Sequence, residues 1–274
     1  MAYKLEALNK IVEWNERNPK SVKDENDKIP ELGNVIAKLG KELQLPGQSR
    51  TYGRWAKVES IGRRTLDKYI HVFEKNIEAQ KRNDLNTELN ILKQASTSDI
   101  VWDEITELEY LDDPKEYVYD FTVPGNDSFM INSGVLVHNT LNSIDWEDKI
   151  IIKDENTQIT KIGEYIDNMI DMNRDNVKYL GNNEEKEMND TYYLDISDKE
   201  IYCPSVDKNG KVSWKQVTAL TKHLPINKDG TNTLVNIKTR MGRSVTATKA
   251  KSFLTRVNNR LMPTRGDEIE VGSY

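Results

Sequence analysis

Hydrophobic residues recur at helical spacing from the start of the chain to about residue 95. Three stretches carry the pattern, and their apolar positions are Leu5, Leu8, Ile11 and Val12, then Ile36, Leu39 and Leu43, then Ile61, Leu66, Tyr69, Ile70 and Phe73. Pro30 precedes the second stretch as a helix-start signal, and Ser60 can cap the third. The pattern predicts a helical region at the beginning of the chain.

From about Asp99 onward the pattern changes to short runs typical of strands. These runs are 118–123, 129–131, 135–137, 149–153, 201–206, 212–217, 233–238 and 245–248. Turn signals separate them, and Asn209-Gly210 predicts a hairpin in which both turn residues have positive φ. Helices are expected only over 162–172 and over 184–188. We therefore expect a mainly β domain of many short strands behind a small, mainly helical α+β region.

The composition favours a polar protein without a metal or cofactor. Of 274 residues, 36% are hydrophobic and 31% charged, and the net charge is −6. No run is long and apolar enough to cross a bilayer and no leader opens the chain, so we expect an intracellular protein with no membrane partner. The single Cys203 excludes an internal disulfide and a cysteine-built zinc cage. His71, His138 and His223 lack the spacing of metal ligands.

A basic and aromatic cluster interrupts this acidic chain between Gly47 and Ile61 and continues into the following helix. Arg54, Arg63, Arg64 and Lys68 could lie against DNA phosphates there. The alternative is a solvated basic helix face, and the sequence alone leaves both interpretations open.

The most informative peptide is Gly134 to Thr140, which ends in His138-Asn139-Thr140. An asparagine can attack its own backbone carbonyl to form a succinimide and so cut the chain after itself. A preceding histidine can give or take a proton near neutral pH, and the following threonine offers a hydroxyl nucleophile. Taken alone, the tripeptide is weak evidence.

The surrounding sequence resembles the intein family of protein-splicing elements. The paired C-terminal blocks resemble 117–130 and 134–139, the first N-terminal block resembles 143–152, and the second resembles 242–249. Val212 to Val217 fits the family, and Val271-Gly272 resembles the strand signal that ends the N-terminal region. The resemblance spans about residues 99–274. It implies the horseshoe-like, mainly β splicing domain that inteins share with hedgehog proteins.

The resemblance also implies roles for individual residues. Ser143 is expected to convert the peptide bond before it into an ester, with Thr246 orienting that bond. Thr140 is then expected to take the acyl group, and Asn139 with His138 to release the product. Asp120 is expected to couple these steps.

Two positions depart from the family pattern. Lys249 stands where the resemblance places a histidine of the second N-terminal block, and an ammonium is a poorer proton carrier near neutral pH. Asp127 stands where the first C-terminal block often has another histidine. Cys203 has no expected catalytic role.

The blocks occur in reversed order. The arrangement divides the chain into 1–95, a C-terminal splicing segment 96–139, an extein-derived linker 140–142 and an N-terminal splicing segment 143–274. Leu141 and Asn142 then form the extein junction. Closing a ring of three residues is badly strained by planar trans peptides, so we expect an uncleaved, precursor-like state. The expected activity is single-turnover autocatalysis on host exteins in cis, by a monomer, with no small-molecule substrate.

The beginning of the chain resembles the last part of a LAGLIDADG homing endonuclease domain between Tyr52 and Ile70. Neither acidic, metal-binding helix of that family is visible, so DNA cleavage is not expected and residual DNA contact is the most that this region predicts.

Three alternatives make different predictions. If the chain is a DNA-binding module with an inert β scaffold, changing Asn139 or Ser143 would not alter its function. A hedgehog-type autoprocessing domain lacks the His-Asn pair that is present here. A hydrolase using Ser143 needs a nearby general-base histidine, and none is evident from the sequence.

Overall fold

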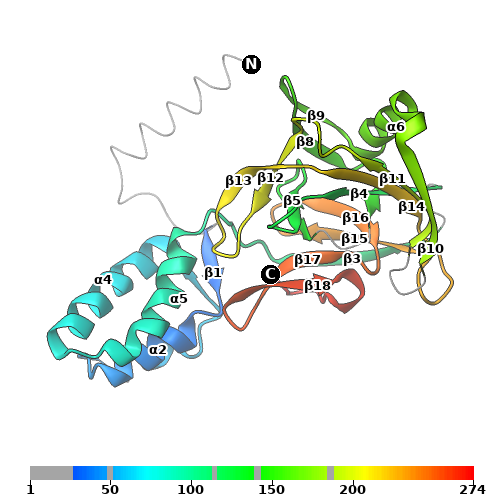
Figure 1. Cartoon of the computed structure of the whole chain (residues 1–274). Helices are drawn as coiled ribbons and strands as arrows, with labels where there is room; N and C mark the ends of the chain where they lie inside the picture. Colours follow the sequence, from blue (N-terminus) through cyan, green and yellow to red (C-terminus); the bar gives the residue numbers. More distant parts are fainter. Residues whose placement is uncertain (1–26, 48–51, 113–115, 139–142, 184–187) are drawn as a thin grey trace, which may run out of the picture. The chain divides into compact units, whose positions relative to one another are not determined.

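The computed structural model describes residues 27–47, 52–112, 116–138, 143–183 and 188–274 (Figure 1). The chain forms two compact units, Met1–Ser96 and Thr97–Tyr274, and each is described by itself. The apolar positions Leu5 to Val12 lie outside the described residues.

The first unit is mainly helical, as its hydrophobic spacing predicts. Its elements are β1 (Lys28–Pro30), α2 (Gly33–Glu42), α3 (Gly53–Trp55), β2 (Ser60–Gly62), α4 (Arg63–Gln80), a 3-10 turn (Asn83–Leu85) and α5 (Asn86–Thr97). The two strands pair antiparallel, with Ile29 opposite Ile61. Helix α4 buries one stripe made of Leu66, Ile70, Phe73 and Ile77, since residues three and four apart share a helix face.

The second unit is mainly β. Its strands are β3 (Ile105–Leu111), β4 (Val118–Thr122), β5 (Ser128–Met130), β6 (Leu136–His138), β7 (Ile144–Asp145), β8 (Lys149–Lys153), β9 (Thr157–Lys161), β10 (Val177–Asn183), β11 (Met188–Asp195), β12 (Tyr202–Val206), β13 (Val212–Gln216), β14 (Ala219–Leu224), β15 (Leu234–Thr239), β16 (Ser244–Thr248), β17 (Ser252–Val257) and β18 (Arg260–Arg265). The helix α6 (Ile162–Met172) and two 3-10 turns, Arg174–Asn176 and Gly266–Glu268, complete it.

Strands from before and after the segment 139–142 interleave in this unit. The eight-stranded sheet has the order β10-β11-β14-β4-β7-β16-β15-β3, so β4 lies between two strands that follow it in the chain by way of that segment. A four-stranded sheet, β18-β17-β6-β5, combines the two parts in the same way, and a third sheet has the order β13-β12-β8-β9. The two parts therefore build one β domain together.

The core of the second unit also draws on both parts. Phe121 and Phe129 from the earlier part lie 5.1 Å apart between ring centroids. They are buried in the same cluster as Ile144, Leu220 and Val235 from the later part. Burial of this apolar surface stabilises the association of the two parts.

Several predicted elements have the predicted bounds, and three details differ. The strand at 149–153 and the helix at 162–172 agree fully. Val271-Gly272 is a turn rather than a strand, because Gly272 has φ +95° and its N–H donates to the Ile105 carbonyl. The hairpin at Asn209-Gly210 forms, but only Gly210 has positive φ, since the Asp207 carboxylate accepts from the Asn209 N–H and shapes a longer loop. Of the helix expected over 184–188, residues 184–187 lie outside the described residues, and Met188 begins a strand.

Among the described residues, no helix is both long and apolar enough to cross a lipid bilayer.

Candidate active site

Ser143 lies directly before β7, in the interior of the β domain. Its side chain and backbone are fully buried. The Ser143 N–H donates to the Thr248 Oγ1 over 3.3 Å, and the Ser143 carbonyl accepts from the Thr248 N–H over 3.0 Å. These two bonds hold the backbone of Ser143 against the end of β16.

The Ser143 hydroxyl faces a buried histidine on β14. Ser143 Oγ lies 2.8 Å from His223 Nε2, and His223 Nδ1 lies 2.9 Å from the Leu224 carbonyl oxygen. A carbonyl only accepts hydrogen bonds, so Nδ1 carries the proton and Nε2 accepts from the serine hydroxyl. Burial lowers the pKa of His223 to about 4, and the Lys251 ammonium acts in the same direction. The imidazole is therefore neutral at neutral pH.

A buried ion pair lies beside these two residues. Lys251 Nζ is 2.8 Å from Asp120 Oδ1, and the lysine is fully buried. The same carboxylate oxygen accepts from the Phe121 N–H over 2.9 Å, and the ammonium lies 5.3 Å from the centroid of the Phe129 ring. Burial raises the pKa of Asp120 to about 7, although Lys251 opposes this rise.

The strand register explains why these side chains meet. Asp120 pairs with Thr221, and Val118 pairs with both His223 and Asp145. Side chains alternate along each strand and paired residues share a face, so Asp120 and His223 lie on the face that Ser143 shares with Asp145. The pairing of Ala247 with Ile144 places Thr248 on that same face. Four adjacent strands thus direct one side chain each toward one site.

His138 ends β6 and approaches the same site. Burial lowers its pKa, with a further lowering by the Lys251 ammonium and a smaller raising by Asp127. Its Nδ1 is buried without a hydrogen-bond partner in the described part of the chain. Asp127 itself is exposed, with φ +49°, and it acts on His138 only through its charge.

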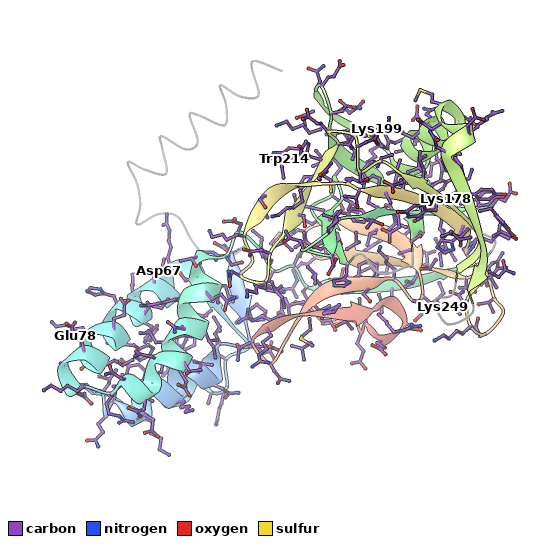
Figure 2. The ribbon with its side chains drawn as sticks, in the orientation of Figure 1. Asp67, Glu78, Lys178, Lys199, Trp214 and Lys249 are labelled. Atoms are coloured by element: carbon purple, nitrogen blue, oxygen red, sulfur yellow. The ribbon has the colours of Figure 1, made fainter. Side chains whose placement is uncertain are left out.

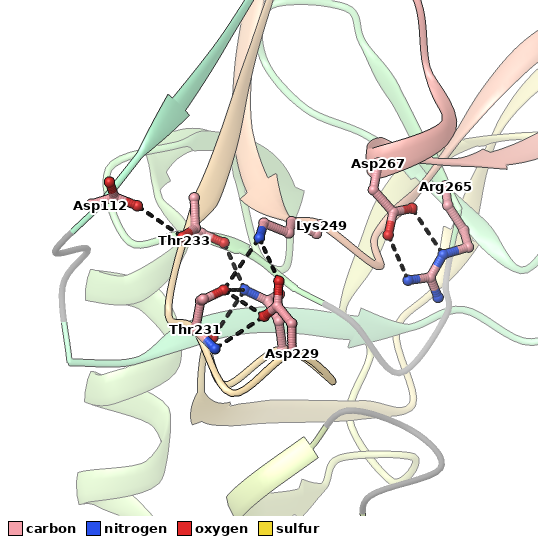
Figure 3. A network of polar contacts seen from close by, with 8 residues as sticks. Asp112, Asp229, Thr231, Thr233, Lys249, Arg265 and Asp267 are labelled. Atoms are coloured by element: carbon pink, nitrogen blue, oxygen red, sulfur yellow. Dashed lines mark hydrogen bonds and ion pairs between the residues drawn. The ribbon is translucent and has the colours of Figure 1, made fainter.

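Thr246 and Lys249 lie away from the Ser143 backbone. Thr246 Oγ1 accepts from Asn236 Nδ2 over 2.7 Å, and Lys249 Nζ lies 2.9 Å from Asp229 Oδ2 and 3.2 Å from Thr231 Oγ1. Figure 3 shows Lys249 within this network, and Figure 2 marks its position in the β domain. The structure thus places Thr248 and Lys251, two residues further along, beside the residues that the sequence assigns to the reaction.

The two alternatives in the second N-terminal block have the same spacing. Thr246-x-x-Lys249 and Thr248-x-x-Lys251 both fit a threonine followed three residues later by the position of a histidine. A shift of two residues keeps a strand residue on the same face, so the pattern of faces cannot separate them. No sequence signal distinguishes His223, which is 80 residues from Ser143.

The remaining predicted reaction and junction residues are Asn139, Thr140, Leu141 and Asn142. All four lie outside the described residues.

The expectation that Ser143 has no nearby histidine is wrong, because β14 brings His223 to it. The pair nevertheless differs from a hydrolase site, since Ser143 and His223 are both 0% exposed and an external substrate cannot reach them.

The predicted DNA-contacting residues divide into two groups. Arg63 has its guanidinium bonded to the Asp27 carboxylate and to the carbonyls of Ala95 and Ser96. Arg54, Arg64 and Lys68 are exposed. Arg63 therefore ties together parts of the first unit, and the predicted DNA contact rests on the other three.

Cys203 belongs to the core of the β domain, where burial raises the pKa of its thiol to about 12. No group of three histidine, cysteine, aspartate or glutamate side chains in the described ranges is arranged to hold a metal ion.

Comparisons with known proteins point to two polymerases. The chain is 35% identical over 119 residues to the DNA-directed RNA polymerase subunit Rpo1C of Methanocaldococcus jannaschii, which is 43% of this chain and 14% of that protein. It is 29% identical over 123 residues to a DNA polymerase of the same organism, which is 44% of this chain and 7% of that protein. The chain therefore matches only a small part of each.

The comparison with solved structures finds a transcription factor IIB mini-intein, labelled Mja. The match has 22% sequence identity and a TM-score of 0.30, and it covers 47% of this chain and 63% of that chain. No family model matches the chain.

The site gathers a buried serine directly before a strand with a histidine, a lysine and an aspartate from neighbouring strands. Ser143 and Asp120 belong to sequence blocks that resemble the intein family.

Proposed function

We propose that this chain is a protein-splicing element whose two splicing segments, 96–139 and 143–274, assemble in reversed order into one reaction centre. The proposal covers the acyl shift at Ser143, transfer of the acyl group to Thr140, and cyclisation of Asn139. It takes the residues that contact Ser143 from the structure and the reaction residues Asn139 and Thr140 from the sequence.

One observation carries the proposal. A single short segment, 248–253, contacts the described residues on both sides of 139–142. At one end Thr248 exchanges hydrogen bonds with Ser143, and at the other end Phe253 pairs with Val137, the neighbour of His138. Between them, the Lys251 ammonium lowers the pKa of both His138 and His223. The described residues on either side of 139–142 therefore lie within the electrostatic influence of one buried cation, Lys251.

Each described residue has a role in this reaction. Thr248 holds the nitrogen of the peptide bond before Ser143, and the Ser143 oxygen attacks the carbonyl carbon of that bond. The bond to nitrogen breaks and an ester forms, leaving a free amine. Lys251 and Asp120 stabilise charge beside both junctions, and the neutral His138 can take up a proton when Asn139 cyclises.

The reversed order determines what the complete reaction would release. The segment between Asn139 and Ser143 supplies both flanking sequences, so splicing joins its own two ends into a ring. Three residues, 140–142, form too strained a ring. Ester formation at Ser143 does not close this ring, so the chain is expected to stop at the ester, and a longer insert removes the barrier to the later steps.

The test lengthens the segment between residues 139 and 143. A small folded domain is inserted after Thr140, and the products are followed by intact-mass spectrometry. Splicing predicts a circular insert, about 18 Da lighter than its linear form because one water is absent, together with the released fragments 1–139 and 143–274. A linear insert alone would indicate side cleavage.

Two variants of the lengthened chain serve as controls. S143A removes the attacking oxygen and should abolish the circular product, and N139A should stop release of the upstream segment. The proposal fails if the lengthened parent remains intact, or if S143A still forms the circle.

A further inference from the structure

We propose that His223 is a catalytic residue of the first step, and that it carries the proton from the Ser143 oxygen to the Ser143 nitrogen. This inference rests on the proposed function and assigns the proton transfer, which the splicing blocks leave without a named base at this junction.

The hydrogen bonds of His223 determine which of its ring nitrogens can accept a proton. Its Nδ1–H is held by the Leu224 carbonyl at 2.9 Å, so Nε2 presents a lone pair to the Ser143 hydroxyl at 2.8 Å. A histidine in the other tautomer could not accept this proton. The neighbouring backbone thus sets the tautomer that the reaction needs.

Within the described part of the chain, no base other than His223 contacts the Ser143 hydroxyl. Ser143 and His223 are both fully buried, so bulk water does not reach the hydroxyl. Among the charged groups facing the imidazole, Lys251 is a cation, and the nearby Asp120 carboxylate is engaged by Lys251 and the Phe121 N–H. His223 Nε2 is the base in direct contact with the nucleophile.

The same buried cation makes the second half of the transfer favourable. A protonated His223 lies beside Lys251, so it is a strong acid that gives up its proton readily. The acceptor is the departing nitrogen, which belongs to the same residue as the attacking oxygen. The imidazole can therefore serve both atoms from one position.

The step balances without any added reactant. The Oγ–H bond breaks as its proton moves to Nε2, and the Oγ–C bond forms at the carbonyl carbon before Ser143. The C–N bond of that peptide then breaks, and the nitrogen takes the proton from Nε2. His223 ends neutral, and the product is an ester with a free amine.

The test uses the full chain and hydroxylamine, a nucleophile that cleaves esters. Intact-mass spectrometry follows the appearance of fragment 143–274 at hydroxylamine concentrations that no longer change the rate. His223→Gln keeps an acceptor near the serine but cannot carry a proton, and we expect its cleavage rate to fall roughly 100-fold. His71→Gln, an exposed histidine of the first unit, is the matched control and should cleave at the parent rate.

Two further readouts separate proton transfer from a structural role. The parent rate should be level across neutral pH, whereas the rate of the His223→Gln chain should rise with pH because, without the imidazole, the small ionised fraction of the serine sets the rate. Ser143→Cys supplies a far more acidic nucleophile. Adding His223→Gln to the Ser143→Cys chain should therefore lower its cleavage rate less than about tenfold. A misfolded variant would fail with either nucleophile.

The outcomes distinguish the two proposals. A parent chain that hydroxylamine leaves intact overturns the proposed function. A parent chain that is cleaved, with a His223→Gln chain cleaved equally fast or with equal losses for serine and cysteine, overturns only the role of His223.

Discussion

Lys251 and Asp120 form an ion pair inside the β domain, with Nζ and Oδ1 2.8 Å apart and side chains 0% and 4% exposed. The two residues lie 131 positions apart and come from two segments of the chain, one before and one after residues 139–142. The pair therefore joins those segments through a contact that water does not screen.

Removing one partner of this pair should destabilise the domain strongly. Lys251→Met leaves the Asp120 carboxylate buried without its cation, and we expect a loss of about 3 to 5 kcal/mol in the free energy of unfolding. Adding Asp120→Asn to that variant removes the isolated charge and should restore most of the loss. Urea denaturation of the parent, both single variants and the double variant measures the coupling, and additive losses would contradict it.

The two threonines of β16 should differ in the reaction. Thr248→Val keeps the shape of the side chain but removes the oxygen that accepts from the Ser143 N–H, so ester formation should slow roughly tenfold. Thr246→Val removes a hydroxyl that bonds Asn236 instead, and its rate should stay near that of the parent. Hydroxylamine cleavage compares the two, and a larger loss in the Thr246→Val chain would favour the other register.

A buried carboxylate should make stability fall as pH rises. Burial raises the pKa of Asp148 from 3.8 to about 7, even though its Oδ2 accepts from the Thr246 N–H. A raised carboxyl pKa favours folding in the protonated form, so this contribution is complete below about pH 4 and is lost as pH passes 7. Asp148→Asn keeps an acceptor without the charge.

We expect Asp148→Asn to gain stability over the parent between pH 5 and 8, on the order of 1 to 3 kcal/mol. Asp120 also has a raised pKa, so it too makes stability fall with rising pH in both chains. The difference in unfolding free energy between the parent and Asp148→Asn therefore reports the contribution of Asp148 alone. Thermal unfolding at several pH values measures it. Asp198→Asn, at an exposed aspartate, should leave the profile unchanged, and parallel profiles for all three chains would refute the prediction.

Much of the fold could be predicted from sequence because period-two alternation and turn residues act locally. The strand at 149–153 and the helix at 162–172 follow from such patterns. The order of strands depends on long-range pairing, and no local pattern predicts that β4 separates β14 from β7.

The site depended on the same long-range pairing. Ser143, His138 and Asp120 stand out because they belong to recognisable blocks. His223 has a role only because β14 pairs with β4, and the register of Thr248 becomes clear only from its hydrogen bonds to Ser143. Sequence spacing could locate the nucleophile but not the groups that surround it.

Substitutions of the two arginines at the start of α4 should have different effects on stability and on DNA binding. The Arg63 guanidinium bonds Asp27 and two carbonyls at the end of α5, so Arg63→Ala should destabilise the first unit by about 1 to 3 kcal/mol. Arg64 is exposed on the next position, and Arg64→Ala should stay within about 0.5 kcal/mol of the parent.

If the basic cluster binds DNA, Arg64→Ala should reduce DNA affinity more than Arg63→Ala does, which is the reverse of their effects on stability. In a gel-shift assay at low salt, Arg64→Ala should weaken binding, because each lost phosphate contact removes one released counterion. Arg63→Ala should alter binding only as far as it unfolds the unit, which circular dichroism under the same conditions measures. Absence of any shift by the parent would leave Arg63 as a structural residue and remove DNA contact from this region.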